Sequence, residues 1–140
     1  MKVFLDTNVV IDFYARRNDF FHAAAVIIDL AVKGKIEIVV SGTTFVNAFY
    51  LLKDYYDEEE LYTAMSNLAD KCEISTIDSD TIKEALAARY TDFEDAVQWL
   101  SARKNNVDVV VTRDRHFRAF SGNIMSPASF LDQYFNNISM

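Results

Sequence analysis

The sequence predicts an α/β fold with three layers, in which a central parallel sheet of four to five strands carries helices on both faces. Two observations predict it. Short runs rich in β-branched residues alternate along the chain with longer segments of helical periodicity, which is the pattern of strand–helix–strand units. The 140 residues also include only three Gly and one Pro, a composition that favours long regular elements over turns.

Four short runs and a fifth, weaker one have the composition of buried strands. Their side chains are mainly apolar and often β-branched, as expected for strands that are covered on both faces. Because helical segments separate consecutive runs, we expect the strands to lie parallel. The predicted strands are Lys2–Asp6, Ile36–Val40, Glu73–Ile77 and Val107–Thr112, with the weaker one at Asn123–Met125.

The segments between the runs carry polar residues suited to helix ends. We expect Asp19 to cap a helix over Phe20–Lys33 that ends at Gly34. Asn8 is expected to cap a shorter helix over Val9–Tyr14. The remaining predicted helices are Thr43–Asp54, Asp57–Lys71, Asp78–Tyr90, Thr91–Lys104 and Ser126–Phe135.

Composition and length limit the classes of protein that fit. With 51% hydrophobic and 25% charged residues, the chain suits a single globular domain over residues 1–140. Its longest apolar stretch, Ala23–Ile28, is far shorter than the roughly 20 residues that span a bilayer, and no signal peptide is recognisable. Cys72 stands alone and permits neither an internal disulfide nor a cysteine-based zinc site. We therefore expect a cytoplasmic protein.

The charge balance is acidic, with 14 Lys and Arg against 21 Asp and Glu and a net charge of −7. Such a chain repels nucleic acid at long range, so a role on nucleic acid requires a local basic patch or metal ions. The densest basic cluster follows the fourth predicted strand. We expect it to contact a phosphate backbone, although a solvated loop that balances nearby acids is the alternative. The cluster consists of Arg113, Arg115, His116 and Arg118.

Acidic side chains stand at the ends of two predicted strands and at the start of one helix. Asp6 ends the first run, Asp114 follows the fourth, and Asp95 lies in the first turn of a predicted helix with Asp92 on the same face. Because the carboxyl ends of parallel strands meet at one edge, we expect these side chains to converge. Converging carboxylates repel one another, and hard cations such as Mg²⁺ and Mn²⁺ relieve that repulsion. The pattern predicts a metal site suited to phosphodiester hydrolysis.

A purely structural interpretation of the same acids stands beside this one. An acid after a strand often caps the next helix or turn, and Asp92 and Asp95 would favour the first turn of any helix. Thr91-x-x-Glu94 has the form of a capping box, which assigns Glu94 to the helix start rather than to a metal.

Three motifs occur in order along the chain: VFLDTNV at the start, DxxDA before an amphipathic helix, and VVTRDxxF near the end. This ordered set resembles the PIN domain family, best known from the VapC-type ribonuclease toxins of toxin–antitoxin modules. The resemblance extends from Lys2 to about Phe130. It implies an acidic ribonuclease site that uses Mg²⁺ or Mn²⁺, with Asp6, Asp95 and Asp114 at the places of the family's first, third and fourth acids. It also implies an RNA substrate, an antitoxin partner and a homodimer.

The sequence departs from the family at the second acid. The family usually has a Glu in the helix after the second strand, and Asn47 occupies that place here. An Asn side chain can orient a water or donate to a phosphate oxygen, but it adds no negative charge. We expect Asp92 to be a candidate fourth ligand. The expected supporting residues of the site are Thr7, Asn8, Asn47 and Thr112.

Three functions remain to be compared. The leading one is a metal-dependent endoribonuclease that resembles the toxin of a toxin–antitoxin pair. The alternative is a catalytically weak PIN-like module that binds RNA or a protein. A phosphorylated receiver domain fits less well, because receivers need paired acids at the first strand and a Lys after a later one. Here Asp6 ends its strand alone, and neither Thr112 nor Arg113 supplies that Lys.

Overall fold

The computed structural model describes residues 1–115, 117, 120 and 122–136. Five strands form one fully parallel sheet in the order β3-β2-β1-β4-β5, which confirms the predicted architecture. The strands are β1 (Lys2–Leu5), β2 (Glu37–Ser41), β3 (Cys72–Ser75), β4 (Val109–Val111) and β5 (Ile124–Met125). The helices are α1 (Thr7–Tyr14), α2 (Phe21–Val32), α3 (Gly42–Leu51), α4 (Glu58–Lys71), α5 (Ser79–Ala88), α6 (Phe93–Lys104) and α7 (Pro127–Tyr134).

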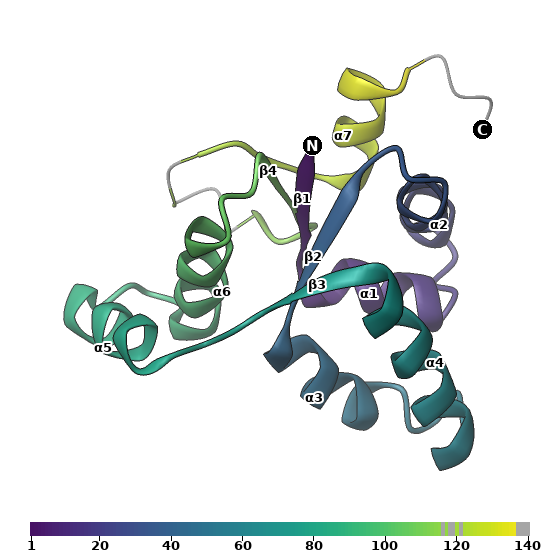
Figure 1. The fold of residues 1–140 in the computed structure, drawn as a ribbon, viewed down its shortest axis with the longest axis horizontal. Coiled ribbons are helices and arrows are strands. Elements are labelled where there is room, and N and C mark those ends of the chain that lie inside the picture. The colour runs from purple at the N-terminus through teal and green to yellow at the C-terminus, as the bar shows by residue number, and fades with distance from the viewer. Residues whose placement is uncertain (116, 118–119, 121, 137–140) are drawn as a thin grey trace.

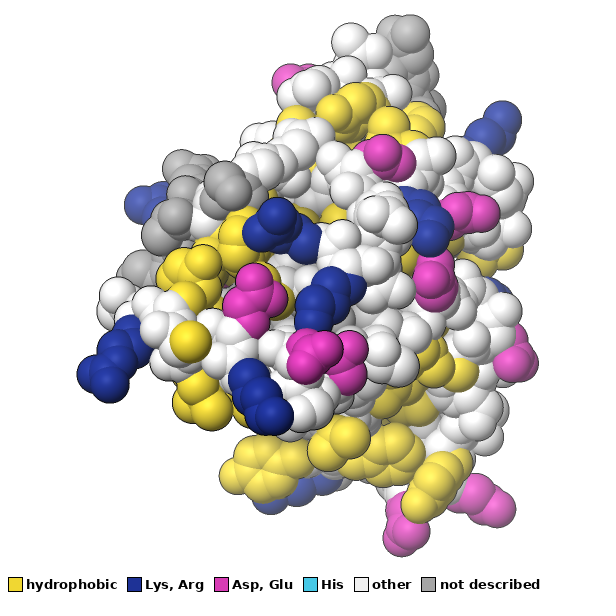
Figure 2. All heavy atoms as spheres, turned by 60° about the vertical axis from the view of Figure 1, so that its left-hand side comes forward, with side chains coloured by type: hydrophobic (Ala, Val, Ile, Leu, Met, Phe, Trp, Pro, Cys, Tyr) yellow, Lys and Arg dark blue, Asp and Glu magenta, His cyan; other side chains and the backbone are white. Residues whose placement is uncertain are grey.

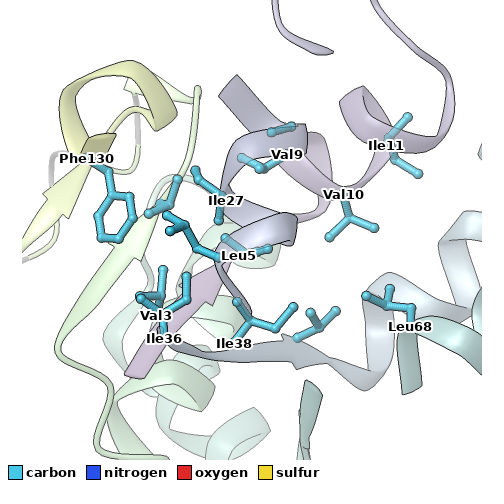
Figure 3. Close-up of a cluster of buried hydrophobic side chains, with 14 of the residues drawn as sticks. Val3, Leu5, Val9, Val10, Ile11, Ile27, Ile36, Ile38, Leu68 and Phe130 are labelled. Atoms are coloured by element: carbon cyan, nitrogen blue, oxygen red, sulfur yellow. The ribbon is translucent and has the colours of Figure 1, made fainter. Parts of the chain in front are cut away.

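Successive side chains of the central strands point to opposite faces of the sheet and enter two separate cores. Val3 and Leu5 of β1 belong to the larger core, which also contains side chains of α1, α2, α4 and α7 (Figure 3). Phe4, between them, belongs to the smaller core against α5 and α6. Figure 1 shows α5 and α6 on one side of the sheet and the other helices across from them. The sheet is therefore covered on both faces.

The structure corrects two of the predicted helix starts. α1 begins at Thr7, two residues earlier than expected, because the Asp6 side chain caps it by accepting a hydrogen bond from the Thr7 backbone N–H at 2.8 Å. Asn8 therefore lies inside the helix and does not cap it. α2 begins at Phe21 after Phe20, with no side-chain cap in the described structure, so the prediction for Asp19 is also wrong.

Three other helix ends follow their sequence signals, and the start of α6 does not. Gly34 ends α2 with a φ of 73°, a left-handed conformation that glycine adopts without strain. Asp57 and Asp78 cap α4 and α5 as the acids at these positions suggested. The cap of α6 differs from expectation, since Asp92 rather than Thr91 accepts the hydrogen bond, from the Asp95 N–H at 3.0 Å.

Connections at the carboxyl edge of the sheet are very short. Only Asp6 separates β1 from α1, and α3 follows β2 without an intervening residue. Strand ends and helix starts therefore meet at this edge, where the polar side chains that follow the strands are held by two elements at once. Among the described residues, none of the helices is both long enough and apolar enough to cross a bilayer.

Candidate metal centre

Three carboxylates gather at the carboxyl edge of the sheet. Asp92, Asp95 and Asp114 each offer an oxygen, and these oxygens lie within 4.8 Å of one another. The first two come from the start of α6, and Asp114 follows β4. Asp95 is buried, Asp114 half-buried and Asp92 exposed, so the cluster opens to solvent on one side. The three acids line a cavity of about 330 Å³ together with Asp6 and Glu94.

Asp6 is held rigidly at the back of this cavity. It is 6% exposed, and its Oδ2 accepts hydrogen bonds from Thr112 Oγ1 at 2.7 Å and from Asn8 Nδ2 at 3.2 Å. The Thr7 N–H binds its other oxygen. Burial raises the pKa of the Asp6 carboxyl group, while the hydrogen bonds from Thr112 and Thr7 act in the opposite direction.

Two threonines connect the segments that carry the acids. Thr112 Oγ1, which donates to Asp6, also accepts a hydrogen bond from the Asp114 N–H at 3.0 Å. Thr7 Oγ1 lies 2.7 Å from Thr44 Oγ1 and accepts from Gln98 Nε2 at 3.2 Å. The first threonine joins β1 to the segment after β4, and the second joins α1 to α3 and α6. Hydrogen bonds thus fix the acids relative to one another.

Asp95 is the buried member of the carboxylate cluster. It is 7% exposed, and its Oδ2 has no hydrogen-bond partner among the described residues. Burial, a hydrogen bond with the Asp114 carboxyl group, and the charges of Asp114, Asp92 and Asp6 raise the pKa of Asp95 to about 8. A cation would give the unpaired oxygen a partner and favour the charged form. A site built from carboxylate oxygens suits Mg²⁺ or Mn²⁺.

Comparisons with known proteins bear on this acidic site. A family model described as "PIN domain" matches residues 2–116. The chain belongs to the PIN domain family. Its curated relatives include "Ribonuclease VapC1" of Aquifex aeolicus, which is 19% identical over 138 residues, covering 95% of each chain.

Solved structures share the fold of this PIN domain. A toxin–antitoxin complex from Klebsiella pneumoniae contains a chain with a TM-score of 0.66 and 22% identity, covering 89% of this chain and 97% of that one. VapC20 of Mycobacterium tuberculosis, described as a sarcin-ricin loop cleaving toxin, has a TM-score of 0.65 and 17% identity, with 84% and 93% covered.

The PIN domain brings the predicted acids together, and their role as metal ligands stays a prediction. Asp92, expected only as a candidate fourth ligand, is one of the three carboxylates of the cluster. Its side chain also caps α6. Asn47 is half-buried on α3, on the helix face that holds Thr44 and Leu51. Leu51 lines the acidic cavity and Thr44 binds Thr7, so this face of α3 is turned toward the site.

Two residues of the predicted basic cluster, Arg113 and Arg115, lie among the described residues. The Arg113 guanidinium makes a two-pronged ion pair with Asp12, so its charge is compensated within the fold. Arg115 is exposed, and His116 and Arg118 lie outside the described residues. On the face drawn in Figure 2, dark-blue basic side chains alternate with magenta acidic ones. The role of these residues in RNA contact remains a prediction.

Asp12 is a residue near the site that sequence reasoning missed. Asp12 is completely buried on α1; its Oδ1 accepts from Arg113 Nη2 at 2.9 Å, and Arg17 Nη1 lies 3.4 Å away. Arg17 also lines the acidic cavity. The available signal was the spacing of Asp12 from Val9, three positions along the apolar face of a helix, where an acid requires a buried partner.

Proposed function

We propose that this PIN domain is a divalent-metal-dependent endoribonuclease that hydrolyses RNA phosphodiester bonds. The buried Asp95 carboxyl group carries the proposal, because one oxygen lacks a hydrogen-bond partner among the described residues and two further carboxylates lie beside it. Asp6, Asp95 and Asp114 would hold Mg²⁺ or Mn²⁺, with Asp92 as a fourth ligand. A cation held by these residues would supply Lewis-acid chemistry for activating a water and for stabilising charge on the phosphate and the leaving oxygen.

The residues around the acids have distinct parts in this proposal. Thr112 and Asn8 keep the Asp6 oxygens in place through their hydrogen bonds. Arg17 lies on the wall of the same cavity. It shares the single negative charge of Asp12 with Arg113, so positive charge remains there for a phosphate group. The exposed Arg115 follows Asp114 directly and offers a second cation to the RNA backbone.

An RNA cleavage assay tests the proposed function. Total RNA and a set of labelled oligoribonucleotides are incubated with the protein in EDTA, in Mg²⁺ and in Mn²⁺, and the products are mapped. We expect cleavage only with a divalent cation. RNA that binds equally well with and without cation and stays intact would instead support the alternative, a catalytically weak module that binds RNA. That alternative is suggested by Asn47, which stands where the family usually has a Glu.

We also infer that the protein works in the cytoplasm with an antitoxin and as a homodimer. Similarity to a toxin–antitoxin complex supports the antitoxin, and exposed apolar side chains support protein contacts in general. Val46 and Tyr50 on α3 and Tyr62 on α4 are among the exposed large hydrophobic residues. Co-expression with the product of a neighbouring small reading frame, followed by co-purification and light scattering, tests both partners.

Asp92→Asn separates the two roles of Asp92. Asn caps helices as well as Asp does, so the free energy of unfolding should change by less than about 0.5 kcal/mol. Loss of one ligand charge should lower metal-dependent cleavage by about tenfold. Asp92→Ala serves as the matched variant and should lose about 1 kcal/mol of stability as well. Full cleavage by the Asn variant would limit Asp92 to capping.

Asn47→Glu should strengthen the site. The longer, charged side chain replaces an amide on the face of α3 that is turned toward the cavity, and it adds the family's second acid. We expect Mn²⁺ to bind up to about tenfold more tightly, equivalent to ~1.4 kcal/mol, and cleavage to increase. Asn47→Gln, which adds length without charge, is the control. Lower cleavage by the Glu variant would show that the present site functions with Asn.

Mg²⁺ binding should become tighter as pH rises toward 8. Asp95 keeps its proton below a pKa of about 8 in the metal-free protein, and a cation must displace that proton. The association constant should rise by up to about tenfold per pH unit between roughly pH 6 and 8 and then level off. Titration calorimetry in buffers of different ionisation enthalpy measures both the constant and the proton released. A constant that is flat over this range would contradict the assignment.

A further inference from the structure

A second cavity lies directly beside the acidic site. Its volume is about 500 Å³, within the range of pockets that hold small organic ligands. Asp114 lines both cavities and forms their common wall. An RNA phosphate held at the carboxylates would therefore have this second cavity next to it.

The lining of the second cavity combines apolar and polar side chains. Phe20, whose side chain is 41% exposed, offers an aromatic ring between α1 and α2. Asp19, Arg115 and Ser126 supply polar groups at the same cavity. The apolar residues that complete the lining are Ala23, Ile124, Met125, Pro127 and Ala128. A ligand that fits this lining is itself largely apolar and carries hydrogen-bonding groups at its edge.

Arg113 adds a flat surface to this cavity. Its guanidinium carbon lies 3.8 Å from the centroid of the Phe20 ring, so the two planar groups are in contact. The ion pair with Asp12 compensates its charge and fixes its orientation. Arg113 therefore offers the cavity a planar guanidinium group in a fixed orientation. Nucleobases in single strands are bound by stacking on aromatic rings and arginine planes.

We propose that this second cavity binds the base of a nucleotide next to the scissile phosphate. The proposal rests on the proposed ribonuclease function, which places a phosphodiester at the shared wall. A base is planar, apolar on its faces and polar at its edge, and thus matches the lining. An aliphatic peptide side chain would contact the apolar residues of the cavity. It would offer no hydrogen-bonding group to Asp19 and Arg115 and no planar group to the Phe20–Arg113 pair.

Binding of nucleoside monophosphates tests the cavity without requiring cleavage. The four 5′-nucleoside monophosphates and ribose 5-phosphate are titrated into ¹⁵N-labelled protein with Mg²⁺. We expect at least one nucleotide to bind about tenfold more tightly than ribose 5-phosphate and to shift the amide signals of Phe20, Ile124 and Met125. Phe20→Ala should abolish this difference, and Tyr62→Ala, which removes an exposed ring on α4, should keep it. Equal binding of all five compounds would overturn the proposal.

A cleavage experiment tests the base-binding proposal separately from the proposed ribonuclease function. An RNA that the protein cleaves is compared with the same RNA carrying an abasic nucleotide on either side of the cleaved bond. For the wild type, an abasic nucleotide on one of the two sides should lower kcat/KM by about tenfold. For Phe20→Ala, the same abasic RNA should lower kcat/KM by less than twofold. Cleavage that ignores the base on both sides overturns the cavity alone. Nucleotide binding without any metal-dependent cleavage overturns the ribonuclease and leaves a nucleotide site.

Discussion

Replacing Asp95 by Asn is expected to lower metal-dependent RNA cleavage by at least about 100-fold while making the metal-free protein more stable. The loss of cleavage follows because the substitution removes the most buried member of the carboxylate cluster and weakens cation binding. The gain in stability follows because the variant no longer places an acid among Asp114, Asp92 and Asp6. Opposite signs in the two measurements distinguish a functional acid from a structural one.

The pH dependence gives the stability effect a second signature. The pKa of Asp95 is raised from 3.8 to about 8 in the folded protein, so the stability that its proton contributes is fully present below about pH 4 and is lost as pH rises through 8. The Asn variant should therefore gain about 1 kcal/mol or more near pH 8, roughly 4 °C in Tm, and little at pH 4. Asp70→Asn, at an exposed position of α4, is the control. Destabilisation by Asp95→Asn at pH 8 would contradict the electrostatic account.

Removing the Asp12 carboxylate should destabilise the fold more than any other single charge change considered. Asp12→Ala leaves Arg113 without its two-pronged partner beside a buried segment, and such losses cost about 3–5 kcal/mol. We expect the midpoint of thermal unfolding to fall by roughly 10 °C or more. Because Arg113 stands between Thr112 and Asp114, residual folded protein should also bind Mg²⁺ more weakly.

Two further variants identify the cause of that destabilisation. Asp29→Ala removes an exposed ion pair with Lys33 and should cost less than about 1 kcal/mol. The double variant Asp12→Leu with Arg113→Met removes both charges and should recover much of the stability lost by Asp12→Ala. A double variant no more stable than Asp12→Ala would show that the ion pair itself, and not the unpaired charge, stabilises the fold.

The sheet could be predicted from the sequence because its signal is local. Runs such as Val107–Thr112 combine β-branched residues with short length, and helical segments between them impose parallel strands. Convergence of Asp6 and Asp114 followed from the same reasoning, since β1 and β4 prove to be neighbours. The order of strands did not follow, because it depends on how distant helices pack.

The details of the site depend on contacts between distant segments, and there the sequence signal was weaker. The spacing of Asp12 from Val9 is a weak signal of a buried acid, since a charged residue is usually solvated, and only the folded structure identifies Arg113 as its partner. Asn8 resembles a helix cap, yet its side chain binds Asp6, two positions away, and Thr112, 104 positions away. The ion pair between Arg113 and the buried Asp12 could not be inferred from sequence either, because the two residues are 101 positions apart.

The junctions between strands and helices decide where this chain tolerates a change in length. One residue inserted beside Asp6 would rotate α1 by about 100° about its axis, turning Asn8 away from the acids and its apolar face out of the core. Between α3 and α4, Tyr55 is exposed and does not line the acidic cavity, whereas its neighbour Tyr56 donates a hydrogen bond to the Tyr14 carbonyl. Homologues of different length should therefore carry their insertions around Tyr55, and peptide tags inserted there should leave metal binding intact.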